Sequence, residues 1–157
     1  MAFRDMREFM SLLAQHGELQ EIKREVDWDL EAGAILRRTY EKKLPAPFLQ
    51  KVKDYPEGYR LFGGMLSTLK RCALALDMNP ESSYKDIMNE YMKRKDNLIK
   101  PRIVKDGPCK ENIYMSDEFD LYNLPAPMIH DGDGGRYLVT WAAVITRDLD
   151  SDWVNWG

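Results

Sequence analysis

The sequence has few cysteines, no long apolar run and little excess of charge. Cys72 and Cys109 are the only cysteines among 157 residues, too few and too far apart for a disulfide framework or a zinc motif. No apolar stretch approaches the ~20 residues of a membrane span, and the N-terminus lacks the apolar segment of a signal peptide. The net charge is −3, and basic and acidic residues are interleaved, which gives no indication of nucleic-acid binding. We therefore expect a cytoplasmic protein with reduced thiols, no membrane span and no nucleic-acid partner.

Apolar periodicity before Asn97 predicts alternating helices and strands, an α/β arrangement. We expect Gly17 to end the first helix in a left-handed conformation, and Asp29 and Ser67 to cap the second and third helices, with Leu69 buried in the third. The predicted helices are Phe3–Leu13, Asp29–Tyr40, Ser67–Leu76 and Ser82–Arg94, and the predicted strands are Leu19–Ile22, Phe48–Val52 and Tyr59–Phe62.

The pattern becomes β-rich after Asn97, with strands predicted at Ile99–Val104, at Glu111–Met115 and again from Tyr137 onward. We expect a domain boundary near residues 97 to 116. The predicted domains are an α/β domain over residues 1–115 and an incomplete β-rich domain over residues 116–157. The last strand is apolar, and because such a sheet edge is normally paired or covered, we expect the chain to be the front part of a larger protein.

Taken one at a time, the candidate functional residues are weak signals. His130 lies beside Asp131 and Asp133, which could bind a metal, although a polar turn is the better interpretation. Gly63-Gly64 lacks the third glycine and the lysine of a phosphate-binding loop, so it indicates close packing. Asn155 offers an amide oxygen suited to a hard cation, but a single asparagine rarely predicts a metal site.

Several motifs in this order resemble the UbiD family of reversible (de)carboxylases, which use prenylated flavin mononucleotide (prenylated FMN) and a divalent metal. The resemblance extends over the whole chain, and the glycine-rich turn with its spacing to Asn155-Trp156 is its most specific part. The motifs are Phe3–Phe9, Gly17-Glu18-Leu19, Tyr59–Gly64, Leu124-Pro-Ala-Pro127, His130–Tyr137, Thr140-Trp141 and Trp153–Gly157.

The resemblance implies roles for five residues near the C-terminus and one more for a backbone carbonyl. Asn155 corresponds to the family's asparagine ligand to Mn2+, which bridges to the flavin phosphate, and the Trp153 carbonyl to a group that helps to hold K+. Trp156 and Gly157 begin the stretch against that phosphate, and Thr140 and Trp141 fall on a strand facing the cofactor. In the family the remaining metal ligands and the proton donor come later in the sequence. The implied fold of residues 116–157 is the start of a split β-barrel, as in flavin reductases.

The implied activity is non-oxidative (de)carboxylation of an aromatic, hydroxybenzoate-type acid or an α,β-unsaturated carboxylic acid through a prenylated-FMN adduct. Trp141 and Gly157 replace the tyrosine and serine of some members that act on alkenoic acids, which favours an aromatic acid. The resemblance also implies a homo-oligomer, and a flavin prenyltransferase that supplies the cofactor. We expect the chain alone to be inactive, because one asparagine cannot retain an octahedral cation and the proton donor is missing.

Two other interpretations remain open. The chain could be a non-catalytic flavin-binding relative of the split-barrel flavin reductases. It could also be an assembly subunit whose barrel strands are completed by a partner chain, which would account for the apolar last strand.

Overall fold

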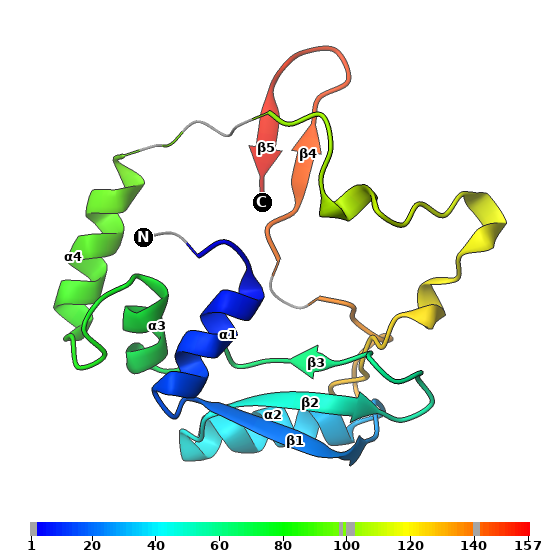
Figure 1. Cartoon of the computed structure of the whole chain (residues 1–157), viewed down its shortest axis with the longest axis horizontal. Coiled ribbons are helices and arrows are strands. Elements are labelled where there is room, and N and C mark those ends of the chain that lie inside the picture. Colours follow the sequence, from blue (N-terminus) through cyan, green and yellow to red (C-terminus); the bar gives the residue numbers. More distant parts are fainter. Residues whose placement is uncertain (1–2, 98, 100–102, 140–141) are drawn as a thin grey trace.

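The computed structural model describes residues 3–97, 99, 103–139 and 142–157, and its first half is an α/β layer (Figure 1). Strands β1 and β2 are parallel and are joined by helix α2, which crosses over between them, while β3 is antiparallel to β2. The elements are α1 (Met6–Gln15), β1 (Leu19–Val26), α2 (Glu31–Lys42), β2 (Ala46–Val52), β3 (Leu61–Phe62), α3 (Leu69–Ala75) and α4 (Tyr84–Lys95). The α/β arrangement predicted for this region is therefore confirmed.

Apolar residues on the two faces of this sheet form two separate clusters. On one face, α1 and α3 pack through Phe9, Leu13 and Leu74 against Ala46 of β2. On the other face, α2 packs through Ala32 against a cluster that also contains Val26 and Leu49. Alternation along β2 sends Ala46 and Leu49 to opposite faces, as expected when helices cover both sides of a sheet.

The helix ends confirm some expectations and correct others. Gly17 has a φ of +69° and follows α1, as predicted. Asp29 does not cap α2: the residue before the helix is Leu30, and Asp29 forms an isolated parallel bridge with Met128. Thr68, not Ser67, caps α3, because its hydroxyl accepts a hydrogen bond from the Arg71 N–H.

Two further expectations about this region have clear outcomes. Leu69, the first residue of α3, is 50% exposed rather than buried. A Cβ on Gly63 would overlap the side chain of Leu36, so the interpretation of this glycine pair as close packing is confirmed.

The second half of the chain has little regular structure among its described residues. The strand predicted at Glu111–Met115 is wrong, since these residues form a loop. In the strand predicted at Ile99–Val104, Ile103 and Val104 also form a loop, and residues 100–102 lie outside the described ones. Three short 3₁₀ turns, Pro108–Lys110, Ser116–Glu118 and Leu121–Asn123, are followed by the antiparallel pair β4 (Ile145–Arg147) and β5 (Val154–Trp156). A split barrel over this region stays a prediction.

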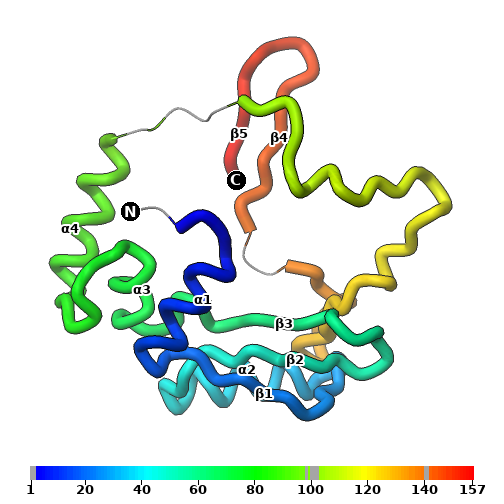
Figure 2. Tube along the Cα trace, viewed as in Figure 1, coloured from blue at the N-terminus to red at the C-terminus, as the bar shows by residue number. Residues whose placement is uncertain are grey.

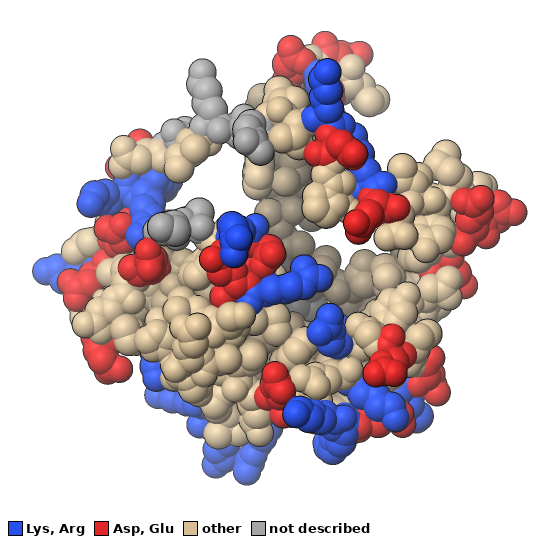
Figure 3. Space-filling view, viewed as in Figure 1, with Lys and Arg blue, Asp and Glu red and all other residues tan. Residues whose placement is uncertain are grey.

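The path of the second half is clear in Figure 2. Residues 103–123 form an exposed arm outside the α/β layer, and the chain becomes half-buried again at Leu124–Ile129, where Ile129 lies against Gly33 of α2. It then ends in the β4–β5 hairpin. On the face shown in Figure 3, Lys and Arg are mixed with Asp and Glu, as the sequence indicated. No helix within the described residues is long and apolar enough to cross a membrane.

Candidate functional site

The β4–β5 hairpin carries four of the residues to which the sequence assigned cofactor or metal roles. Asn155 lies opposite Thr146 in the strand register. The pair is extended by two backbone hydrogen bonds between Val144 and Gly157, of 2.6 and 3.0 Å, which fix the end of the hairpin. The structure thus places Trp153, Asn155, Trp156 and Gly157 on one short, hydrogen-bonded element.

Exposure differs along this strand. Asn155 is half-buried, whereas Trp153 and Trp156 are 64% and 67% exposed. The Trp153 carbonyl, predicted to help hold K+, accepts a hydrogen bond from the Asp148 N–H at 3.0 Å. Because a carbonyl oxygen has two lone pairs, this bond leaves one of them free for a cation.

The loop between the two strands is stabilised by its own side chains. The Ser151 hydroxyl donates to the Asp148 carboxylate at 2.6 Å, and this hydrogen bond is the main reason why the pKa of Asp148 is lowered from its ordinary value. Arg147 pairs with Asp152 across the same loop. These contacts hold the turn, and none of them involves Asn155.

A complete metal site is absent from the described part of the chain. No group of three or more His, Cys, Asp or Glu side chains that could hold a metal ion occurs there. His130 and Asp133 contact each other at 3.4 Å, but two hydrogen bonds between them, one from each backbone N–H, make this a polar turn, as the sequence favoured. The amide of Asn155 alone does not fit an octahedral cation, so we derive no chemical step through a metal.

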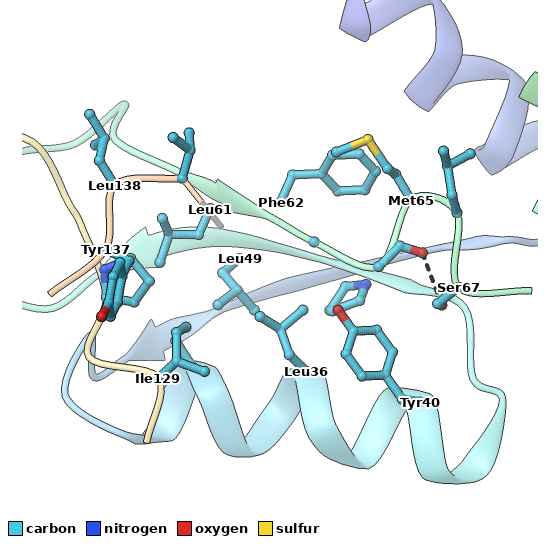
Figure 4. A pocket seen from close by; sticks show the side chains of 17 residues that line it. Leu36, Tyr40, Leu49, Leu61, Phe62, Met65, Ser67, Ile129, Tyr137 and Leu138 are labelled. Carbon is cyan, nitrogen blue, oxygen red and sulfur yellow. Dashed lines mark hydrogen bonds between the residues drawn. The ribbon is translucent and has the colours of Figure 1, made fainter. Parts of the chain in front are cut away.

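Thr140 and Trp141, the other two predicted cofactor-facing residues, lie outside the described residues. The segment just before them forms one wall of an apolar cavity of about 320 Å³ (Figure 4). Leu36 and Tyr40 of α2 form the floor, Leu61 and Phe62 the upper edge, and Tyr137 and Leu138 one end. Asn155 is not among its lining residues, so the structure does not bring the cavity and the hairpin residue together.

The residue that sequence reasoning missed is Arg136. Its guanidinium carbon lies 4.0 Å from the ring centroid of Trp28, 5.5 Å from that of Tyr122 and 5.8 Å from that of Tyr55. Its Nε donates to the Ala126 carbonyl at 2.6 Å, and its Nη2 donates to the Tyr55 hydroxyl. We call Arg136, Trp28, Tyr55, Tyr122 and the Ala126 carbonyl the Arg136 cluster. No local signal reveals it, because its members come from four separate segments.

Comparison with known families identifies both halves of the chain. Residues 10–91 match the 3-octaprenyl-4-hydroxybenzoate carboxy-lyase N-terminal domain, and residues 102–157 match the Rift-related domain of the same carboxy-lyase. The chain belongs to the UbiD family. The family that the motifs indicated is therefore confirmed.

Two curated relatives of the chain are named decarboxylases. The chain is 33% identical over 162 residues to the pyrrole-2-carboxylic acid decarboxylase of Pseudomonas aeruginosa, covering 97% of this chain and 32% of that protein. It is 34% identical over 163 residues to ferulic acid decarboxylase 1 of Saccharomyces cerevisiae, with the same coverage. The chain thus spans about a third of the length of the curated relatives that it matches.

Solved UbiD-class structures have the same fold over this region. The open form of the vanillic acid decarboxylase of Sedimentibacter hydroxybenzoicus matches 100% of the chain with a TM-score of 0.89 and 30% identity, over 35% of its own length. An evolved dimeric form of the enzyme HmfF from Pelotomaculum thermopropionicum, in complex with prenylated FMN, matches 98% with a TM-score of 0.82 and 25% identity, over 34% of its length.

Proposed function

We propose that this chain is the N-terminal part of a decarboxylase that uses prenylated FMN. The observation that carries the proposal is the match of both halves to UbiD-family domains, together with a fold shared with an enzyme bound to prenylated FMN. The cofactor supplies the electrophilic centre and the electron sink for loss of carbon dioxide. This chain's contribution is to bind and orient that cofactor.

Asn155 is the proposed ligand through which the chain reaches the metal and the flavin phosphate. Asn155 is half-buried on a hairpin whose backbone is held by hydrogen bonds, a geometry that limits where its side chain can reach. Mn2+ is the proposed metal, and K+ is the proposed ion at the Trp153 carbonyl. Trp156, Gly157, Thr140 and Trp141 are proposed to lie along the cofactor.

The proposed substrate is an aromatic or α,β-unsaturated carboxylic acid, and the direction is decarboxylation. The relatives' names support this class, since they act on pyrrole-2-carboxylic, ferulic and vanillic acids. We also propose that the complete protein is a homo-oligomer that obtains its cofactor from a flavin prenyltransferase. The chain alone is expected to be inactive, since among its described residues no group of three or more His, Cys, Asp or Glu could hold the metal.

The decisive variant is Asn155→Ala in the complete protein, produced together with a flavin prenyltransferase. Loss of a metal ligand is expected to reduce bound manganese and carbon dioxide release by at least about tenfold. Asn89→Ala, which removes an exposed amide on α4, is the matched control and is expected to change neither quantity. Full manganese content and full turnover in Asn155→Ala would refute the assignment of this residue. Failure of the unmodified protein to retain prenylated FMN would refute the proposed function itself.

A further inference from the structure

The Arg136 cluster joins the parts of the chain that match two different family domains. Trp28 and Tyr55 lie within the residues that match the N-terminal domain, whereas Tyr122, Ala126 and Arg136 lie within those that match the Rift-related domain. The Tyr55 hydroxyl accepts from Arg136 and donates to the Tyr122 carbonyl at 2.9 Å. One guanidinium and one phenol therefore connect four segments.

The segment that Arg136 closes has two anchored ends and a middle that is held by the His130–Asp133 turn but has open space around its glycines. At its first end, Met128 donates to the Trp28 carbonyl at 3.0 Å and accepts from the Leu30 N–H at 2.9 Å. The middle contains Gly132, Gly134 and Gly135, and a Cβ at any of them would meet nothing within 4 Å. Glycines in open space cost conformational entropy to order and contribute no packing in return. The position of the second end therefore depends on Arg136 and on the hydrogen bond from the Tyr137 N–H to the Pro127 carbonyl, at 3.2 Å.

The residues that follow this second end matter for the cofactor. Tyr137, Leu138 and Val139 line the apolar cavity against α2 and β3 (Figure 4), and the next two residues in the sequence are Thr140 and Trp141. Thr140 is four peptide units from Arg136 and Trp141 is five, so a displacement of Arg136 would have only a short stretch of chain over which to be absorbed. The requirements are specific to arginine, because a planar guanidinium can stack on Trp28 while donating in its own plane, which an ammonium cannot do.

We infer that Arg136 is a positioning residue: by docking on Trp28 and Tyr55 it fixes residues 137–139 against the N-terminal layer. These residues directly precede Thr140 and Trp141 in the sequence, which are predicted to face the cofactor. The effect of Arg136 on the cofactor rests on the proposed function, whereas its effect on the position of residues 126–139 does not. Arg136 itself touches neither Asn155 nor the hairpin in any contact of the described residues.

The test compares Arg136→Lys with Arg60→Lys in the complete protein made with a flavin prenyltransferase. Arg60 also stacks on an aromatic ring, that of Phe48 at 5.5 Å, but lies outside the Arg136 cluster, so it is a matched control. Amide hydrogen exchange reports on residues 126–139 without any cofactor. Arg136→Lys is expected to accelerate exchange at Met128 and Tyr137 about tenfold, whereas Arg60→Lys leaves both unchanged.

The second measurement is turnover per bound flavin, which a loss of stability alone would not change. Arg136→Lys is expected to lower kcat per bound flavin about tenfold while KM for the acid changes less than about twofold, because misplacement affects the reacting geometry more than substrate binding. Tyr55→Phe, which keeps the ring and removes the shared hydroxyl, is expected to act in the same direction. Its effect should be less than additive with that of Arg136→Lys, because both changes disrupt one network.

The outcomes separate the two proposals. Unchanged exchange in Arg136→Lys, or equal acceleration in Arg60→Lys, would overturn the docking role. Faster exchange with unchanged kcat per bound flavin would overturn the positioning role. If the unmodified protein binds no prenylated FMN, the proposed function and the positioning role fall together, while exchange still decides whether Arg136 docks the segment.

Discussion

Gly33 lies inside α2, yet we expect its replacement by alanine to destabilise the protein. Helix interiors normally favour alanine over glycine by about 1 kcal/mol, so on local grounds Gly33→Ala should stabilise the protein. Gly33 is buried beneath the backbone of Ile129. A Cβ there would lie 2.9 Å from the Ile129 carbonyl carbon and closer still to its oxygen.

The expected size of the effect follows from what must move. Backbone cannot rotate away as a side chain can, so the added methyl must displace Met128 and Ile129 from α2. Overpacking of this kind costs about 1–3 kcal/mol. The two hydrogen bonds of Met128 with Trp28 and Leu30 are also at risk, at about 1 kcal/mol each. After the helix-propensity gain of about 1 kcal/mol, we expect a net loss of about 2–4 kcal/mol when both hydrogen bonds are lost.

The assay is urea unfolding combined with amide exchange at Met128. Ala34→Gly is the matched control, since Ala34 is the next residue of α2, is exposed, and reports helix propensity alone. It is expected to lose about 1 kcal/mol with no change in Met128 protection relative to the rest of α2. Gly33→Ala is expected to lose both global stability and Met128 protection.

One result would refute this reasoning directly. If Gly33→Ala gains about 1 kcal/mol and Met128 keeps its protection, then Ile129 does not pack on Gly33. If global stability rises but Met128 exchanges faster, the clash is real and is relieved by local detachment of residues 127–139.

Two further predictions concern titratable groups. The Glu31 carboxylate accepts from the Asp27 N–H at 2.8 Å, which is the main reason why its pKa is lowered from the ordinary 4.5, and it pairs with Arg24. A lowered folded pKa means that this stabilisation is present at neutral pH and is lost as the pH falls below 4.5. The free energy of unfolding, measured with urea, should therefore fall more steeply with acid for the unmodified protein than for Glu31→Gln. Equal dependence on pH in the two proteins would contradict this role of Glu31. Cys109 is exposed, whereas Cys72 is half-buried, donates to the Leu66 carbonyl and has a pKa raised mainly by burial. A thiol reagent should therefore modify one thiol quickly and the second only after unfolding, and Cys109→Ser should remove the fast reaction.

The first hundred residues were the more predictable part of the fold. Their helices and strands follow from apolar spacing and turn residues that act within a few positions, and Gly17 ends its helix as the local pattern requires. The errors fall where tertiary contacts override local preference. Asp29, a good capping residue, is instead drawn into a bridge with Met128.

The second half was less predictable for a physical reason. A strand forms only where a partner strand is available, and the apolar pattern at Glu111–Met115 carries no information about a partner. In the structure this segment belongs to the exposed arm and forms no ladder. The hairpin at Ile145–Trp156 did form, because its two strands are close in sequence and pair with each other.

The sequence by itself determined the alternating helices and strands of the first half, the polar turn at His130 and the motifs that indicated the UbiD family. It also put Asn155, Trp156 and Gly157 in consecutive positions. Only the tertiary structure decided that Gly33 must remain small beneath Ile129, and that Arg136 stacks on Trp28 and bonds to Tyr55. The reason is that local patterns are set by neighbours along the chain, whereas these contacts join residues far apart in sequence and exist only once the chain has returned to the α/β layer.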